Sequence, residues 1–392
     1  MRECKTIECV GKKCTGCRAC EQICPKSCIS MKKNEEGFLY PTINKNRCIN
    51  CGMCKQTCHV ENKYKETTKT QEVYAMKPKN ENISKKSTSG GMFFILAKYV
   101  LQQNGSVYGC AFTNELKAQH VRIKKEEELN KLRGSKYVIS DTSNMFSNVK
   151  EDLNNNQFVL FTGTPCQIAG LKKFLNKDYE KLITMDFVCH GVPSQELFSN
   201  YIKWLENKLN DKIINYEFRN KEKKDWGIEF TAKIETKRGI IKYLKADFDP
   251  YYSAFLSGKI YRECCYECEY ASVKRVSDIT VGDFWGIEKI EPSFYSELGV
   301  SLIIVNTKKG EKILEEIKDD LILKNVTMND AIKKNHNLTH PSEKKVERKE
   351  IYIKMDNFGN CAKKYMLPKN KIKIIVKNAI PKKIKLFLKK HI

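Results

Sequence analysis

The segment CTGCRACEQICP at residues 14–25 and its counterpart CINCGMCKQTCH at residues 48–59 decide the fold of the N-terminal part of the chain. In each segment two-residue gaps separate three cysteines, and a fourth cysteine follows after three more residues. A cubane iron–sulfur cluster needs four thiolates, and two-cluster modules take three from one repeat and the fourth from the other. We therefore predict two [4Fe–4S] clusters in a ferredoxin-like module over residues 1–65. The predicted ligands are Cys14, Cys17, Cys20 and Cys58 for the first cluster, and Cys48, Cys51, Cys54 and Cys24 for the second.

Zinc is the alternative occupant of Cys-x-x-Cys pairs. A zinc site uses four ligands and gives no reason for eight cysteines in a crossed arrangement, so the spacing favours clusters. One position departs from the usual motif, because His59 follows Cys58 where proline is common. Proline there shapes the backbone and binds no iron, so we expect the cluster to form. Cys4, Cys9 and Cys28 lie outside the pattern, and we expect them to be small buried residues or free thiols.

Composition sets the broad class of the protein. The chain has 392 residues, of which 41% are hydrophobic, so it can bury a sizeable core in two or three domains. The longest apolar runs are far shorter than the roughly 18 residues of a membrane span. No secretory signal is visible at the N-terminus. Eighteen cysteines in such a chain indicate metal thiolates in a reducing compartment rather than disulfides, so we predict a cytoplasmic protein.

Buried strands and glycine-containing turns characterise residues 72–345. The apolar run 158–161 ends at Gly163-Thr164-Pro165-Cys166, and a second run over 182–188 ends at Cys189. Continuous apolar runs are typical of buried strands in α/β folds. Ligands bind at the carboxyl ends of such strands. We predict an α/β domain here, in two parts over 72–150 and 151–345.

Four thiols outside the N-terminal module are candidates for a third [4Fe–4S] cluster. Cys265 and Cys268 form another Cys-x-x-Cys pair, and Cys166 and Cys189 complete the set. In the alternative interpretation Cys166 is a redox thiol and the pair binds zinc or nothing.

Asp186 and His190 also stand at a strand end and are candidates for proton transfer, since histidine titrates near neutral pH. A structural hydrogen bond is the alternative role for His190.

Small hydroxyl and glycine residues, Ser87-Thr88-Ser89-Gly90-Gly91, precede an apolar helical run that begins at Met92. Free backbone N–H groups at a helix start can bind an anion, which suits a phosphate-bearing cofactor. An ordinary helix cap with a tight turn is the other interpretation. A second basic turn, Gly134-Ser135-Lys136, leads into another predicted strand.

Residues 346–392 are predicted to form a basic, amphipathic helical tail. From Cys361 to Ile392 there are eleven lysines and no acidic residue, within a net charge of +24. Such a helix can lie on an anionic membrane surface, dock on a partner or cover its own domain, so peripheral membrane contact is one expectation. Nucleic-acid binding is not expected, because the tail has no arginine and few aromatic residues to stack on bases.

Read together, residues 73–305 resemble the family of coenzyme F420 hydrogenase/dehydrogenase β subunits, in which an N-terminal ferredoxin module is a common companion. The segments that carry the resemblance are Ser87–Gly91, Gly134–Val138, Gly163–Gln167, Asp186 with Cys189–Ser194, Cys265–Cys268 and Gly282–Gly286. The family implies FAD and a [4Fe–4S] cluster, with electrons passing between them. The flavin then exchanges a hydride with coenzyme F420 or another organic acceptor.

The resemblance also implies where the flavin binds. Ser87–Gly91 is expected near its ribityl-phosphate region, with Gly134, Ser135 and Lys136 nearby and Gly163 and Thr164 as further contacts. Lys136 either neutralises the pyrophosphate or polarises the flavin.

The expected fold class is α+β: the ferredoxin-like module, an α/β flavin-binding oxidoreductase domain and the basic tail. A flavin converts between one-electron and hydride chemistry, so we expect an iron–sulfur flavoprotein oxidoreductase. The alternative is an electron-transfer protein that carries clusters only and serves a partner enzyme. In either case the expected partner is a redox protein or a small-molecule electron donor or acceptor.

Overall fold

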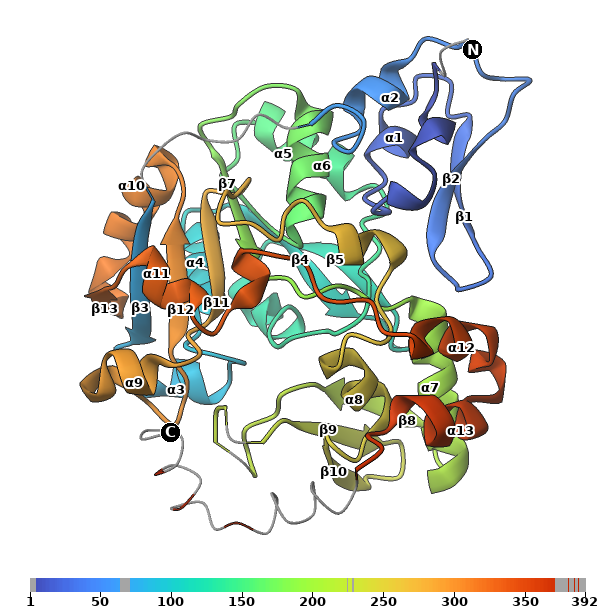
Figure 1. The fold of residues 1–392 in the computed structure, drawn as a ribbon. Helices are drawn as coiled ribbons and strands as arrows, with labels where there is room; N and C mark the ends of the chain where they lie inside the picture. Colours follow the sequence, from blue (N-terminus) through green and yellow to red (C-terminus); the bar gives the residue numbers. More distant parts are fainter. Residues whose placement is uncertain are drawn as a thin grey trace.

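The computed structural model describes residues 5–63, 71–223, 225–227 and 229–370, together with Ile380, Ile384 and Phe387. Most of the lysine-rich segment predicted to form an amphipathic helix therefore lies outside the described residues. The chain forms an N-terminal module, a large mixed sheet and a small antiparallel sheet (Figure 1). Helices and strands are mixed, as predicted. Among the described residues, no helix has both the length and the apolar character needed to cross a bilayer.

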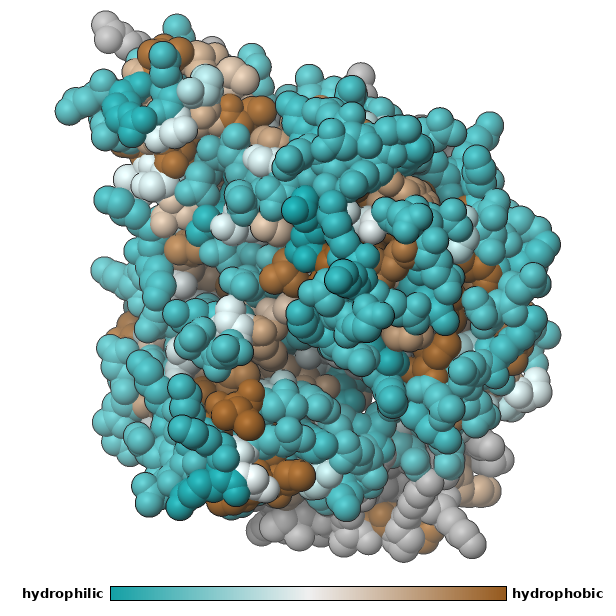
Figure 2. All heavy atoms as spheres, turned by 180° about the vertical axis from the view of Figure 1, so that it is seen from behind, coloured by the Kyte–Doolittle hydropathy of each residue, from teal (hydrophilic) through white to brown (hydrophobic). Residues whose placement is uncertain are grey.

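The N-terminal module is small and built around its cysteines. Its elements are the 3₁₀ turn η1 (Ile7–Lys13), the short helices α1 (Ala19–Gln22) and α2 (Met53–Thr57), and the antiparallel strands β1 (Ile29–Lys33) and β2 (Leu39–Ile43). Five of the buried residues in its core are cysteines, which pack with Ile7, Val10, Ile29 and Ile43. Hydrophobic side chains also reach the module's surface (Figure 2). Because so little of this core is aliphatic, whatever the thiols bind contributes to holding the module together.

The large sheet has eight strands in the order β13-β3-β12-β11-β7-β6-β4-β5. The strands are β3 (Glu72–Pro78), β4 (Ser106–Phe112), β5 (Ala118–Ile123), β6 (Val159–Thr162), β7 (Leu182–Phe187), β11 (Ile279–Asp283), β12 (Ser301–Val305) and β13 (Leu321–Asn325). The four central neighbours β4, β6, β7 and β11 run parallel, and the outer pairs run antiparallel. The strands predicted from the apolar runs at 158–161 and 182–188 are confirmed as β6 and β7.

Helices cover both faces of this sheet because its central strands are apolar on both sides. α4 (Met92–Gln102) and α10 (Lys308–Glu316) pack on the face that carries Leu160. α5 (Met145–Asn154) and α6 (Pro165–Leu175) pack on the opposite face, which carries Val159 and Phe161. The remaining helices of the large-sheet region are α3 (Glu81–Lys85), α9 (Ile287–Ile290) and α11 (Met328–Ile332).

The small sheet contains β8 (Ile213–Glu217), β9 (Thr231–Thr236) and β10 (Ile241–Lys245), in the order β10-β9-β8. An aromatic core joins it to α7 (Gln195–Leu209), α8 (Pro250–Leu256), α12 (Glu347–Ile353) and α13 (Phe358–Cys361). Short helical turns complete the described chain: η2 (Glu126–Lys131), η3 (Glu263–Glu267), η4 (Pro292–Phe294), η5 (Lys318–Asp320), η6 (His336–Leu338), η7 (Met355–Asn357) and η8 (Ala362–Met366).

The N-terminal module is docked onto the rest of the protein by buried polar contacts. Arg262 is 0% exposed, and its guanidinium donates to the backbone oxygens of Cys14 (2.7 Å) and Leu39 (2.9 Å). Arg348 binds both carboxylate oxygens of Glu36, at 2.8 and 2.7 Å. Since each of these contacts joins two segments far apart in sequence, they fix where the cysteines stand relative to the large sheet.

Replacing Arg262 with methionine should loosen this docking. The two buried carbonyl oxygens would lose their donor, at a cost of about 1–3 kcal/mol each, so we expect a clear fall in thermal unfolding temperature and faster proteolytic release of the module. Arg238→Met is the matched control, because that side chain is 60% exposed in its ion pair with Asp211. Equal effects of the two substitutions would contradict the docking role of Arg262.

Candidate iron–sulfur centres and cofactor pocket

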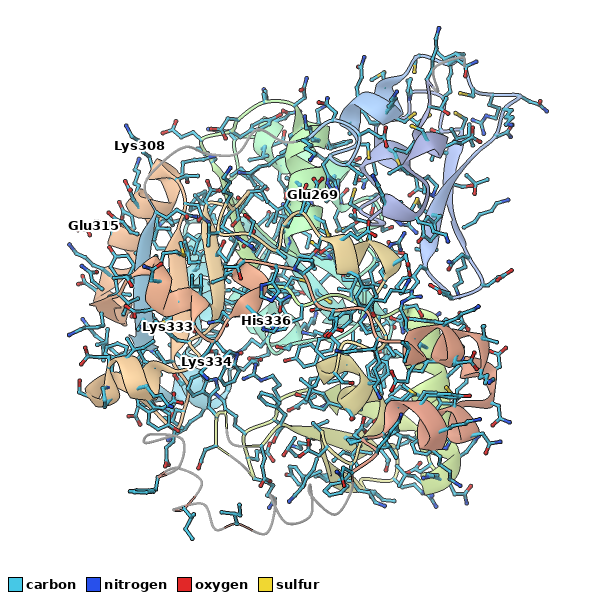
Figure 3. All side chains as sticks on the ribbon, viewed as in Figure 1. Glu269, Lys308, Glu315, Lys333, Lys334 and His336 are labelled. Carbon is cyan, nitrogen blue, oxygen red and sulfur yellow. The ribbon has the colours of Figure 1, made fainter. Side chains whose placement is uncertain are left out.

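The eight cysteines of the two repeats lie in the N-terminal module, where Cys14, Cys17, Cys20 and Cys58 are called the first set and Cys24, Cys48, Cys51 and Cys54 the second, following the predicted ligands. In the described part of the chain, no three cysteine, histidine or acidic side chains converge closely enough to hold a single metal ion. Sulfur atoms gather in the N-terminal module (Figure 3). Burial, followed by the neighbouring thiols of Cys17, Cys14 and Cys58, raises the pKa of Cys20. Cys54 of the second repeat contributes after Cys58. The thiols that raise the pKa of Cys17, after burial, are Cys14 and Cys58, so Cys58 lies near the first repeat. All cysteines that the structure describes are free of disulfides.

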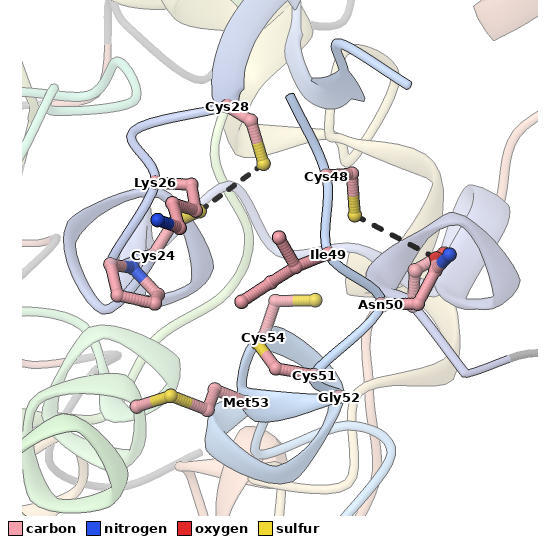
Figure 4. A pocket seen from close by; sticks show the side chains of 12 residues that line it. Cys24, Lys26, Cys28, Cys48, Ile49, Asn50, Cys51, Gly52, Met53 and Cys54 are labelled. Atoms are coloured by element: carbon pink, nitrogen blue, oxygen red, sulfur yellow. Dashed lines mark hydrogen bonds between the residues drawn. The ribbon is translucent and has the colours of Figure 1, made fainter. Parts of the chain in front are cut away.

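The second set surrounds a pocket that is lined by Cys24, Cys48, Cys51 and Cys54 (Figure 4). Cys28 lines the same pocket, and its Sγ lies 3.3 Å from the Sγ of Cys24. We expected Cys28 to be a buried residue or a free thiol outside the cluster pattern. It is buried and free, but the structure makes it a fifth thiol of the second set. A turn in which the N–H of Ser27 donates to the oxygen of Cys24 brings it there.

Both cysteine loops have the same backbone geometry. The second and fourth residues after the first cysteine have positive φ in each repeat: Gly16 (75°) and Arg18 (62°) in one, Asn50 (53°) and Gly52 (77°) in the other. Alternation with left-handed residues turns successive backbone N–H groups toward one side, which makes a concavity for an anionic group. The repeated sequence spacing thus folds into two loops of equivalent shape.

A third set of thiols lies between the module and the large sheet. Cys166 is in the first turn of α6, where Thr164 caps the helix and its hydroxyl lies 3.1 Å from the Cys166 sulfur. Burial, then Cys268, raises the pKa of Cys166, with Cys264 and Cys17 also contributing. Cys189, which follows β7, lies near Cys166 and Cys268.

Cys264 was not among the predicted ligands of the third set, yet it is an electrostatic neighbour of Cys166 and Cys268, and also of Cys14. The predicted ligand Cys265 is its direct neighbour in sequence and, like Cys189, is an electrostatic neighbour of Tyr261. In the sequence Cys264-Cys265-x-x-Cys268, either of the first two cysteines could pair with Cys268. Only the path of the chain through η3 distinguishes the two.

Asp186 is fully buried in an ion pair with Arg275, whose Nη2 lies 3.0 Å from its Oδ1. The hydroxyl of Thr280 donates to the same oxygen at 2.6 Å. Arg275 also donates to the backbone oxygens of Tyr270 and Ser272, just beyond Cys268. Its other oxygen, Oδ2, is buried without a hydrogen-bond partner among the described residues, and the role of Asp186 in proton transfer stays a prediction.

His190 keeps part of its side chain exposed and lies edge-to-face with His336, with 5.9 Å between ring centres. Figure 3 labels His336, an exposed residue of η6, near the centre of that view. Desolvation by the surrounding protein, followed by the neighbouring His336, lowers the pKa of His190. The imidazole is therefore neutral at physiological pH and can act as one donor and one acceptor.

A second pocket lies beside the loop between β8 and β9, and Thr88, Arg219, Lys221 and Trp226 are among its lining residues. Arg219 binds both carboxylate oxygens of Asp283. The indole of Trp226 donates to the same carboxylate and stacks on Trp285, with 4.9 Å between ring centres.

Lys221 ties three chain segments together at this pocket. Its ammonium donates to the backbone oxygens of Ser84 (2.6 Å), Leu298 (2.6 Å) and Ser89 (3.3 Å). Burial and then the nearby Arg219 lower the pKa of Lys221 to about 7. Sequence reasoning missed Arg219, Lys221 and Trp226, and the only local signal was a basic run beginning at residue 219 between two strands.

The residues predicted to contact the flavin lie in different places in the structure. Thr88 and Ser135 meet, since the backbone N–H of Ser135 donates to the Thr88 hydroxyl at 3.1 Å. Gly163 and Thr164 instead build the start of α6, where Gln167 completes the cap.

The other hydroxyl and glycine residues of the 87–91 loop serve packing. Ser89 donates to the oxygen of Val300, and the N–H of Gly90 donates to the Ser301 hydroxyl. A Cβ on Gly90 would stand 2.8 Å from the oxygen of Met76, so only glycine fits. Ser87 accepts from Arg133, Gly91 caps α4 at φ 92°, and Lys136 donates to the oxygen of Arg133.

Comparison with known proteins places these features in families. Residues 157–331 match the family that comprises the C-terminal part of the coenzyme F420 hydrogenase/dehydrogenase β subunit, and residues 13–62 match the 4Fe-4S dicluster domain. The chain is 25% identical over 323 residues to the coenzyme F420-dependent sulfite reductase of Methanocaldococcus jannaschii, covering 80% of this chain and 47% of that protein. It is 21% identical over 327 residues to the F subunit of the F420H2 dehydrogenase of Methanosarcina mazei, covering 79% and 83%.

The chain thus spans about half the length of the first relative and most of the second. A structure of the F420-reducing [NiFe] hydrogenase complex from Methanosarcina barkeri is similar with a TM-score of 0.43 and 17% identity, over 66% of this chain and 82% of that one. The longer family match contains Cys166, Cys189 and the cysteines of η3, and the shorter one contains both cysteine repeats. Residues 157–331 are therefore similar to the C-terminal part of the coenzyme F420 hydrogenase/dehydrogenase β subunit, and residues 13–62 are similar to a 4Fe-4S dicluster domain.

Proposed function

We propose that this protein is an iron–sulfur flavoprotein oxidoreductase. In this proposal electrons pass between three [4Fe–4S] clusters and a bound FAD, and the acceptor or donor of hydride is coenzyme F420 or another organic molecule. The observation that carries the proposal is the continuity of the thiol sets. Cys17 of the first set is an electrostatic neighbour of Cys166 in the third, and Cys189 of the third adjoins His190 and the region of the Arg219 pocket.

The donor chemistry of each set fits a [4Fe–4S] cluster. The first set supplies four thiols, and the second and third supply five each. Two buried guanidinium groups stand beside them: Arg262 near Cys14 and Cys264, and Arg275 near Cys189 and Cys268. A thiolate-ligated cluster is anionic, and a buried anion needs a partner of opposite charge. Bound clusters would supply one-electron transfer.

The lining of the second pocket suits a polar part of an organic cofactor. Lys221 and Arg219 carry positive charge, Arg219 is paired with Asp283, and the carboxylates of Asp225 and Glu229 line the same pocket. Thr88 adds a hydroxyl, and Trp226 and Phe230 add flat apolar surface. A flavin bound there would supply conversion between one-electron and hydride chemistry. Thr88 and Ser135 would hold its polar chain, and neutral His190 would donate or accept a hydrogen bond beside it.

A protein that delivers or removes single electrons would approach the second thiol set. Cys51 is exposed there, and the flanking Ile49 and Met53 are 57% and 37% exposed. The related chain of the F420H2 dehydrogenase is by its name one subunit of that enzyme, which supports a protein partner for this chain. A membrane role for the basic tail stays a prediction.

The first test is the cofactor content of the anaerobically purified protein. We expect about twelve iron atoms, equivalent sulfide and one FAD per chain, because three clusters hold four irons each. About eight irons without flavin would contradict the enzyme and leave a two-cluster electron carrier that serves a partner.

Substitutions in the third set should remove one and the same cluster. Cys166→Ala and Cys268→Ala should each lower the iron content by about four atoms, and the double variant should lose no more than either alone. Comparing Cys264→Ala with Cys265→Ala then identifies the fourth ligand. Cys361→Ala is the control, since this thiol is 1% exposed but lies in the α13 core. Additive losses in the double variant would show that the two cysteines serve different sites.

Lys221 should make flavin binding depend on pH. The ammonium is protonated below its pKa of about 7 and attracts an anion, so the Kd for FAD should rise as the pH increases through 7. Lys221→Met should weaken binding by about tenfold or more below pH 7, because the positive charge attracts an anion about 4 Å away by roughly 1–4 kcal/mol, and its pH profile should be flat. Titration of the apoprotein with FAD by fluorescence measures both. Lys223→Met, an exposed lysine of the same loop, should bind like the wild type; a wild-type profile for Lys221→Met would contradict the assignment.

A further inference from the structure

A chain of three polar side chains, with half-buried Thr15 and Tyr270 on either side of buried His59, joins the N-terminal module to the third thiol set. The Thr15 hydroxyl lies 3.0 Å from Nε2 of His59, and the Tyr270 hydroxyl lies 2.7 Å from Nδ1 of the same ring. His59 is 1% exposed, and its ring centre is 5.5 Å from that of Tyr270. None of these three residues has a role in the cofactor sites described above.

Each member of this chain stands next to a proposed cluster ligand. Thr15 directly follows Cys14, and His59 directly follows Cys58, so both are attached to cysteines of the first thiol set. Tyr270 comes two residues after Cys268, and its electrostatic neighbours include Cys166, Cys17 and Cys268. The hydrogen-bonded chain therefore begins at the first set and ends at the third.

The imidazole of His59 suits this place because it offers two bonding atoms on opposite sides of one ring. A neutral imidazole has one donor and one acceptor nitrogen, and each hydroxyl can take the complementary role. Both ring nitrogens are thus satisfied without water. Proline, which is common at this position of the motif, has no side-chain nitrogen for either bond.

Helix α6 brings the same two sets together independently of His59. Cys166 and Gly170 are four residues apart and lie on one side of the helix, about 6 Å apart along its axis. Gly170 packs against the first set, since a Cβ at this position would stand 2.8 Å from the Cys17 sulfur. One helical turn therefore separates the residue that supplies the third set from the residue that contacts the first.

We propose that the Thr15–His59–Tyr270 chain is the electron-transfer link between the first and third clusters, with His59 as its positioning residue. This inference rests on the proposed third cluster. In the step one electron leaves the reduced first cluster and enters the oxidised third cluster, no bond forms or breaks, and a one-electron carrier re-reduces the module. The three side chains fill the space between the two sites, so the electron passes along covalent bonds and two hydrogen bonds.

The order of the sites follows from the same contacts. The first set is next to the third, whereas the second set faces outward with Cys51 exposed. Electrons from a protein donor would enter at the second cluster, continue to the first and reach the third through the link.

The experiment uses the full chain, purified without oxygen, reduced by a one-electron reductant and frozen at intervals for EPR. The EPR signal that is present in the wild type and missing in the Cys166→Ala variant identifies the third cluster. Tyr270→Phe and His59→Pro should slow the arrival of the electron at that cluster by at least tenfold while iron stays at about twelve per chain. His59→Gln, which keeps a donor and an acceptor, should recover part of the rate lost in His59→Pro.

Tyr266→Phe is the matched control, because this buried phenol of the same segment bonds to the oxygen of Gly258 and the N–H of Tyr261 instead. Its rate should equal that of the wild type. A wild-type rate in Tyr270→Phe at full iron content would overturn the link and leave the proposed function intact. About eight irons in the wild type would remove the third cluster itself, and both proposals with it. If the His59→Pro variant loses iron, only the Tyr270→Phe variant, which lacks a single hydroxyl, tests whether the chain carries the electron.

Discussion

The buried guanidinium of Arg262 is the interaction on which the arrangement of the sites depends. It reaches from the segment that carries Cys264 into the N-terminal module, where it binds two backbone oxygens and lies over the ring of Tyr40 at 4.2 Å. A buried charge is tolerated only where hydrogen bonds and opposite charge surround it. Arg262 has carbonyl oxygens on one side and the thiols of Cys14 and Cys264 on the other. The same group that docks the module therefore also offers positive charge to the thiol sets.

Features set by residues close together in sequence could be predicted. In the N-terminal module, two identical cysteine spacings give two loops with matching positive-φ residues. In the large sheet, the apolar runs before Gly163 and Cys189 become the central strands β6 and β7. Cys28 was the exception. Its place at the second pocket depends on the turn that begins at Cys24, which the ligand spacing alone does not reveal.

The second pocket and the third thiol set were harder to predict, because they are assembled from segments far apart in the chain. Lys221 bonds to residues 84, 89 and 298, and no local pattern reports such contacts. The proton-transfer role of Asp186 was predicted from its position at a strand end. Its ion pair with Arg275, which is 89 residues away in sequence, could not be predicted from that position. Cys264 and Cys265 are adjacent in sequence, so spacing could not separate their roles.

The predicted crossed grouping of the cysteines would make the two repeats interdependent. Each repeat would complete the ligand set of the other, so neither half of the module could hold a full cluster alone. Because metal binding of this kind is also folding energy, filling one site would pre-organise the ligands of the other. With that grouping the module would mature as an all-or-none unit, and a substitution in one loop would reduce the electron-carrying capacity of both.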